Sequence, residues 1–237
     1  MAATVETTAT AKPPEPPIVL QKEGVEPTAA VIWMHGLGDT PMGWAQQCAQ
    51  WHKALEGKVK FILPHAFVQP VTCNGGMSMT SWMDLAEIPI RIASPDSGAQ
   101  QQQSIEYVLG LAAAEAAKGI PPERIVFGGF SQGGALSLAC AVNSGAKVAG
   151  CISLSGWALP AQNIGSKVRS CASKGSPFLV CHGDADNVVL TENAPHAAKL
   201  LTDAGCDVTL KVFPGMAHSS CAQESWEVID FLQKVLP

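Results

Sequence analysis

The chain has 237 residues, of which 47% are hydrophobic, and its formal net charge is −5. This length fits one large α/β domain or two small ones, and the apolar content is enough to bury a substantial core. The acidic balance and the lack of basic clusters argue against nucleic acid as a partner and against a membrane surface bound by electrostatics.

Apolar runs alternate with helical patterns from about residue 29 onward. We expect strands at 29–34, 59–63, 124–128, 148–154, 178–181 and 207–213. We expect helices at 42–55, 100–118, 132–143, 192–204 and 221–235. Two of these strand segments, 148–154 and 178–181, are continuously apolar, as buried parallel strands are. The pattern predicts an α/β fold, with a mainly parallel central sheet and helices on both faces, in a single domain over residues 18–237.

The first 17 residues are rich in Ala, Thr, Pro and Glu, which predicts a disordered N-terminal tail. They lack the features of a secretory signal, a transit peptide or a lipidation site. No apolar stretch approaches the roughly 20 residues that a transmembrane segment needs. The eight cysteines are scattered without a C-x-x-C pair, so we expect reduced, buried thiols in a cytoplasmic protein.

The connection at 64–98 is long for a strand-to-helix loop in a compact domain. It contains three of the seven methionines and the apolar stretch 88–92. This apolar content argues against disorder, and a methionine-lined surface suits apolar ligands of variable shape. Alternatively, these side chains simply cover the edge of the sheet. The sequence also leaves open a role as a lid, a lipid contact or a subunit contact.

Residues 129–133 read Gly-Phe-Ser-Gln-Gly, a G-x-S-x-G motif centred on Ser131. A strand-like run precedes the motif and a helix-like run follows it, which is the context of a nucleophile elbow. The glycines two positions either side of the serine leave room for a sharp, strained turn. The alternative is a glycine-rich turn in which Ser131 only caps the helix.

A catalytic serine needs a base that is itself oriented by a carboxylate. In α/β-hydrolase sheets the chain order is serine, acid, histidine. His218 lies between the last strand and the last helix, at the carboxyl edge of the sheet where ligands bind. His182 precedes the acidic candidates and His196 falls inside a helix, so His218 is the expected base.

Asp184 and Asp186 both follow the strand at 178–181, and their spacing favours neither as the acid. The charge that develops on the attacked carbonyl oxygen needs backbone N–H donors. One donor comes from the residue after the nucleophile, Gln132, and another from a loop after an early strand. The glycine-rich segment 35–38 matches that loop, although an ordinary turn is the alternative.

With these segments in place, the chain resembles the acyl-protein thioesterase and small carboxylesterase (lysophospholipase-like) family of α/β-hydrolases from about Ile32 to Pro237. The matching segments are 35–39, 70–84, 94–97, 128–135, 182–186 and 215–221. The resemblance implies the α/β-hydrolase fold and a serine mechanism without a cofactor. By matched position it assigns the nucleophile to Ser131, the acid to Asp186, the base to His218, and the oxyanion-hole N–H groups to Leu37 and Gln132.

The chain departs from the family pattern at three places. The family usually has prolines at the positions of Asn187 and Leu190, so we expect a less rigid acid loop here. Acidic residues that often follow Ser97 are replaced by the segment 98–103, and the middle residue of the Trp-Phe-Asp signature is a methionine. The last two departures touch the loop expected to hold the acyl chain. Our acyl-site candidates in that loop are Trp82, Met83, Ile88 and Ile90.

We expect hydrolysis of a thioester or ester through an acyl-enzyme, with S-acylated proteins, and palmitoyl-cysteine in particular, as substrate. A broad carboxylesterase or lysophospholipase acting on lipid or small esters is the alternative. A non-catalytic hydrolase-fold receptor is disfavoured by the complete set of serine, acid and base. Nucleotide binding is excluded because neither G-x-G-x-x-G nor a P-loop lysine is present, and His218 with Cys221 lacks further metal ligands. Transient membrane association and a weak homodimer are left open.

Overall fold

The computed structural model describes residues 14–96 and 98–237. Its main sheet has seven strands in the order β1-β3-β2-β6-β7-β8-β9. These strands are β1 Ile18–Leu20, β2 Ala29–Met34, β3 Val59–Leu63, β6 Ile125–Phe130, β7 Gly150–Leu154, β8 Pro177–Gly183 and β9 Asp207–Phe213. Strand β1 pairs antiparallel with β3, whereas all other neighbours in this sheet run parallel. Strands β2, β3 and β7 are buried at every position, in keeping with their mainly apolar sequences.

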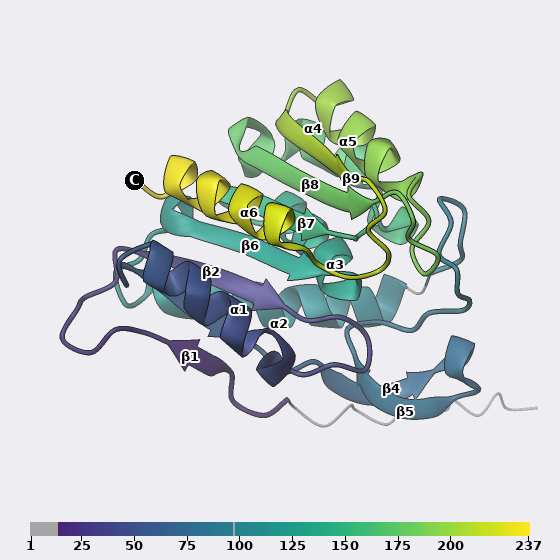
Figure 1. Ribbon diagram of the computed structural model, residues 1–237, viewed down its shortest axis with the longest axis horizontal. Helices are drawn as coiled ribbons and strands as arrows, with labels where there is room; N and C mark the ends of the chain where they lie inside the picture. The colour runs from purple at the N-terminus through teal and green to yellow at the C-terminus, as the bar shows by residue number, and fades with distance from the viewer. Residues whose placement is uncertain (1–13, 97) are drawn as a thin grey trace, which may run out of the picture.

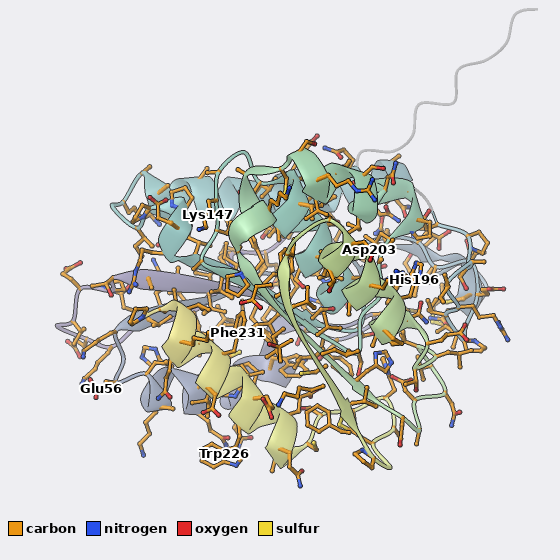
Figure 2. The ribbon with its side chains drawn as sticks, turned by 90° about the horizontal axis from the view of Figure 1, so that it is seen from above. Glu56, Lys147, His196, Asp203, Trp226 and Phe231 are labelled. Carbon is orange, nitrogen blue, oxygen red and sulfur yellow. The ribbon has the colours of Figure 1, made fainter. Side chains whose placement is uncertain are left out.

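Helices cover both faces of this sheet. They are α1 Pro41–Ala54, α2 Gly98–Ala116, α3 Gln132–Asn143, α4 Ile164–Ser170, α5 Asn193–Asp203 and α6 Ala222–Val235. Helices α1 and α6 pack on the face that is turned toward the viewer in Figure 1, and the other four pack on the opposite face. Helix α6 has one buried and one exposed face: Figure 2 shows Phe231 turned toward the sheet and Trp226 turned toward solvent.

The expected α/β architecture, with a mainly parallel sheet between two helical layers, is confirmed. No strand or helix was expected in the long connection at 64–98. It contains an antiparallel hairpin, β4 Phe67–Val71 with β5 Met77–Ser81, which forms a separate two-stranded sheet. Pro70 lies within β4. Proline argues against a central strand and is tolerated in edge strands such as this one, so the sequence did not indicate the hairpin. The short elements β1 and α4 were also not expected.

Strands from Ile18 to Phe213 share the main sheet, and we therefore propose that residues 18–237 form one domain. Most of the expected disordered tail lies outside the described residues, which begin at Pro14. None of the helices in the described residues is long and apolar enough to cross a membrane. All eight cysteines are free, and five of them are buried.

The parallel strands bring their carboxyl ends to one edge of the sheet, on the side of the arrowheads in Figure 1. The segment after β2, the turn after β6 and the loops after β8 and β9 all emerge at this edge. These four connections contain the predicted nucleophile, acid, base and oxyanion-hole residues, whereas the acyl-site candidates lie in the connection after β3. In open α/β sheets this edge is where ligands bind.

Candidate active site

Ser131 lies at the turn between β6 and α3, with φ 57° and ψ −119°. A positive φ is uncommon for a residue with a side chain, so the surrounding structure must enforce it. A Cβ atom on Gly133 would lie 2.1 Å from the carbonyl oxygen of Met34, and one on Gly129 would lie 2.5 Å from the backbone of Gly133. The Ser131 hydroxyl makes no capping hydrogen bond to α3, so the interpretation of this serine as a helix cap is wrong.

The Ser131 hydroxyl is in contact with an imidazole that also contacts a carboxylate. Its Oγ lies 3.0 Å from Nε2 of His218, and Nδ1 of His218 lies 2.7 Å from Oδ2 of Asp186. Because a carboxylate only accepts, Nδ1 carries the proton and Nε2 can accept from the serine hydroxyl. A base-activated serine nucleophile requires this arrangement. The catalytic roles of the three residues stay a prediction.

The two candidate acids, Asp184 and Asp186, which their spacing in the sequence could not distinguish, make different contacts in the structure. Asp184 turns toward the loop after β9, where its Oδ1 accepts the N–H of Gly215 at 2.6 Å. This contact is typical of an aspartate that stabilises a turn. Asp186 is the carboxylate placed against His218, and its Oδ1 accepts the N–H groups of Val188 and Val189 at 2.8 and 2.9 Å.

Asp186 also contacts a second imidazole. Nε2 of His182 lies 3.2 Å from Oδ2 of Asp186 and 2.8 Å from the carbonyl oxygen of Val189. Burial alone would raise the pKa of Asp186, but hydrogen bonds from both histidines and two backbone N–H groups outweigh it and hold this pKa well below its ordinary value. Asp186 is therefore a carboxylate at neutral pH. Sequence reasoning missed this contact, because a spacing of four residues across a loop does not indicate whether the side chains of His182 and Asp186 meet.

The segment predicted to supply an oxyanion donor lies against the Ser131 turn. A Cβ atom on Gly36 would meet the Ser131 Cβ at 3.4 Å. The buried His35 ring donates from Nδ1 to the Gly36 carbonyl oxygen at 2.8 Å and accepts the Ala66 N–H at Nε2 at 3.3 Å. Burial lowers the pKa of His35, in keeping with this neutral ring. The Leu37 N–H donates to no other described residue, so it is available to an incoming oxygen.

An apolar cavity of about 400 Å³ opens beside Ser131 and His218. This volume lies within the range of small-molecule sites. The apolar side chains that line the cavity include Trp44, Leu85, Ile88, Ile90, Phe130 and Trp157. Two of the acyl-site candidates, Ile88 and Ile90, are therefore next to the candidate nucleophile.

The other two acyl-site candidates require a correction. Trp82 and Met83 are fully buried in the core on the side of α2 and α3, and neither lines the cavity. The Trp82 indole N–H instead donates to the His35 carbonyl oxygen at 2.8 Å. The Met83 carbonyl oxygen accepts from Nε2 of Gln132, also at 2.8 Å. The apolar character of the segment could be read from the sequence, but the direction of its side chains could not.

Glu224, in the first turn of α6, is a buried acid that sequence reasoning missed. Neither of its carboxyl oxygens makes a hydrogen bond to a described residue. Burial raises the pKa of Glu224 to about 7, and the nearby Ser220 hydroxyl and His182 ring offset this only in part. Its sequence position, near the start of a helix, is common for a solvent-exposed glutamate and gave no signal of burial.

The phospholipase/carboxylesterase family model matches residues 16–236. The chain belongs to this family. The acyl-protein thioesterase 1 of Gibberella zeae is 40% identical over 217 residues, which cover 89% of this chain and 92% of the relative. The acyl-protein thioesterase 1 of Mycosarcoma maydis is 37% identical over 235 residues, which cover 93% and 96%.

Solved structures of similar proteins agree with this assignment. Arabidopsis thaliana SOBER1 superposes with a TM-score of 0.82 at 30% identity, over 88% of this chain and 99% of that chain. Zea mays acyl-protein thioesterase 2 superposes with a TM-score of 0.75 at 26% identity, over 93% and 99%. This phospholipase/carboxylesterase family member is thus an α/β-hydrolase and an enzyme, a serine hydrolase of ester or thioester bonds. The interpretation as a non-catalytic receptor is not supported.

Proposed function

We propose that this hydrolase removes long acyl groups from protein cysteines through an acyl-enzyme on Ser131. The observation that carries the proposal is the Ser131–His218–Asp186 hydrogen-bond chain, with distances of 3.0 and 2.7 Å, beside an apolar cavity. The names of its relatives, acyl-protein thioesterase 1, support the choice of a thioester substrate.

In the first step Ser131 Oγ attacks the acyl carbon while Nε2 of His218 takes its proton. Asp186 holds the proton on Nδ1, which keeps Nε2 free to act as the base, and stabilises the imidazolium that forms. The electron pair of the carbonyl bond moves to oxygen, and the N–H groups of Leu37 and Gln132 would stabilise the resulting oxyanion by donating hydrogen bonds to it.

The tetrahedral adduct collapses with loss of the cysteine sulfur, which takes the proton from Nε2 of His218. A thiol with a pKa of about 8.5 is a good leaving group, whereas an alkoxide depends more on this proton. Water, activated by the same imidazole, then hydrolyses the Ser131 ester and releases the fatty acid. Because this chemistry serves esters and thioesters alike, binding must decide the substrate.

The cavity beside Ser131 is the feature that can select the acyl chain. Each methylene moved from water to an apolar site contributes about 0.8 kcal/mol, so even about six extra methylenes strongly favour a longer chain. Ile88, at 44% exposure, lies partly in solvent and Ile90 is buried, which suits a chain that enters from the surface. We expect medium-to-long acyl chains to be preferred.

The decisive experiment compares wild type with Ser131→Ala on 4-nitrophenyl esters from acetyl to palmitoyl and on a palmitoyl-cysteine peptide. Activity that requires Ser131 and favours longer chains and the thioester would support the proposal. Activity confined to lipid or short esters would favour the alternative, a broad carboxylesterase or lysophospholipase, which the family description also covers. Turnover that survives Ser131→Ala would contradict the mechanism.

We further propose that the enzyme acts in the cytoplasm and meets its S-acylated substrates at membrane surfaces without spanning them. Eight free cysteines, five of them buried, suit a reducing compartment. Cell fractionation with and without inhibition of protein acylation would test this location. The weak homodimer stays a prediction, which sedimentation at several concentrations would test.

A further inference from the structure

The segment Thr80–Met83 lies where β5 ends, and it makes hydrogen bonds to both loops that the proposed mechanism uses as oxyanion donors. One loop contains Leu37 and the other begins α3 at Gln132. The segment contains no group that reaches the cavity beside Ser131. Its hydrogen bonds therefore need an explanation other than contact with substrate.

On the side of Leu37, the segment holds the loop at three points. The Trp82 indole N–H donates to the carbonyl oxygen of His35 at 2.8 Å. The N–H of Gly38 donates to the Thr80 carbonyl oxygen at 2.9 Å, and the Thr80 hydroxyl donates to the carbonyl oxygen of Asp39 at 2.6 Å. Leu37 lies between these contacts, so they restrict where its N–H can point.

On the side of Gln132, the same segment holds the side chain at both ends of its amide. The Trp82 backbone N–H donates to Oε1 of Gln132 at 3.0 Å, and Nε2 of Gln132 donates to the Met83 carbonyl oxygen at 2.8 Å. The Ser104 hydroxyl donates to the Trp82 carbonyl oxygen at 2.5 Å and fixes the segment to α2. Trp82 and Gln132 are both fully buried, so water does not compete for these bonds.

We infer that Trp82 is a positioning residue that sets the Leu37 and Gln132 N–H groups relative to one another. Oxyanion donors stabilise the transition state only when they lie about 2.7–3.1 Å from the developing charge. A shift of about 1 Å can cost about 10²-fold in rate. Trp82 contacts one donor loop through its indole and the other through its backbone, so its side chain ties the first loop to the second. The inference rests on the proposed function, because it requires an acyl-enzyme on Ser131.

The test is Trp82→Phe, which keeps an aromatic ring and removes the indole donor. We expect kcat to fall about 10–10²-fold with KM within about threefold of wild type, and by the same factor for acetyl and octanoyl esters. Affinity for a trifluoromethyl ketone, which forms a tetrahedral adduct with the serine, should fall by a similar factor. Thr80→Val removes one hydroxyl contact at nearly constant shape and should act in the same direction, more weakly.

Trp51→Phe is the matched control, since Trp51 is also fully buried and donates its indole N–H to the Ser225 hydroxyl at 2.9 Å. It should lower the melting temperature as Trp82→Phe does while kcat stays within about twofold of wild type. An unchanged kcat in both Trp82→Phe and Thr80→Val would overturn the inference, as would a loss that grows with acyl length or an equal loss in Trp51→Phe. Failure of the proposed function is distinguishable, because it would appear as turnover by Ser131→Ala.

Discussion

Glu224 makes the stability of this protein depend on pH in a direction that can be predicted. The side chain is fully buried and its pKa is raised to about 7, so the folded protein holds a proton that the unfolded chain releases above about pH 4.5. Between these values the folded state binds more protons than the unfolded state. The free energy of unfolding therefore falls as pH rises through this window and levels off above pH 7.

The size of the effect follows from the two pKa values. A tenfold change in the protonation equilibrium corresponds to about 1.4 kcal/mol, so a pKa of about 7 in place of 4.5 costs the folded state about 3 kcal/mol at high pH. Glu224→Gln keeps the shape of the side chain and removes its ionisation. The free energy of unfolding of the variant minus that of wild type should therefore increase by about 2.5 kcal/mol from pH 5 to pH 8.

Equilibrium urea unfolding of both proteins at pH 5, 6, 7 and 8 measures this difference. His35 titrates in both proteins, so its contribution cancels. Glu227→Gln is the control on the same helix, since Glu227 pairs with Lys211 at 3.0 Å near the surface, and its difference from wild type should stay nearly constant. A constant difference for Glu224→Gln over this range would refute the reasoning.

Two further substitutions test the site. Ile88→Asp introduces a charge into the cavity and should lower kcat/KM for octanoyl esters at least about tenfold more than for acetyl esters. Ile92→Asp, at similar exposure but outside this cavity, should leave the ratio unchanged; equal losses on both esters for Ile88→Asp would reject the acyl site. Asp186→Asn should lower kcat about 10³–10⁴-fold, because an amide can donate to His218 and favour the wrong tautomer. Steady-state ester hydrolysis measures this loss, and a kcat for Asp186→Asn equal to that of wild type would show that Asp186 has no part in the mechanism.

Ser131 could be predicted from sequence because its setting is local. Glycine is required on either side of Ser131 because an added Cβ atom would lie 2.1 or 2.5 Å from backbone atoms, and this crowding follows from the strand–turn–helix geometry itself. The placement of His218 could be predicted from chain order, since the loop after the last parallel strand must emerge at the same edge as the turn after β6. Both inferences need only the sequence of elements.

Side-chain direction could not be predicted in the same way. Asp184 and Asp186 are two residues apart in one loop, and only their separate contacts to Gly215 and His218 distinguish them. Trp82 and Met83 are of the apolar residue types that often line ligand sites, yet their hydrogen-bond partners, His35 and Gln132, are about 50 residues away in the chain. Such contacts depend on how the 64–98 connection folds over the sheet edge, which periodicity does not encode.

The acid loop shows what replaces a missing proline. Leu190 stands where the resembling family usually has proline, and its N–H donates to the Ile90 carbonyl oxygen at 3.0 Å, a bond that proline cannot make. The Ile90 N–H in turn donates to the Val188 carbonyl oxygen at 2.8 Å. Backbone hydrogen bonds to Ile90, a residue that lines the cavity, therefore hold the loop after Asp186, whereas a proline would restrict it by fixing φ. Substitutions at Ile90 would disturb acid and cavity together, which is why Ile88 is the cleaner test of acyl binding.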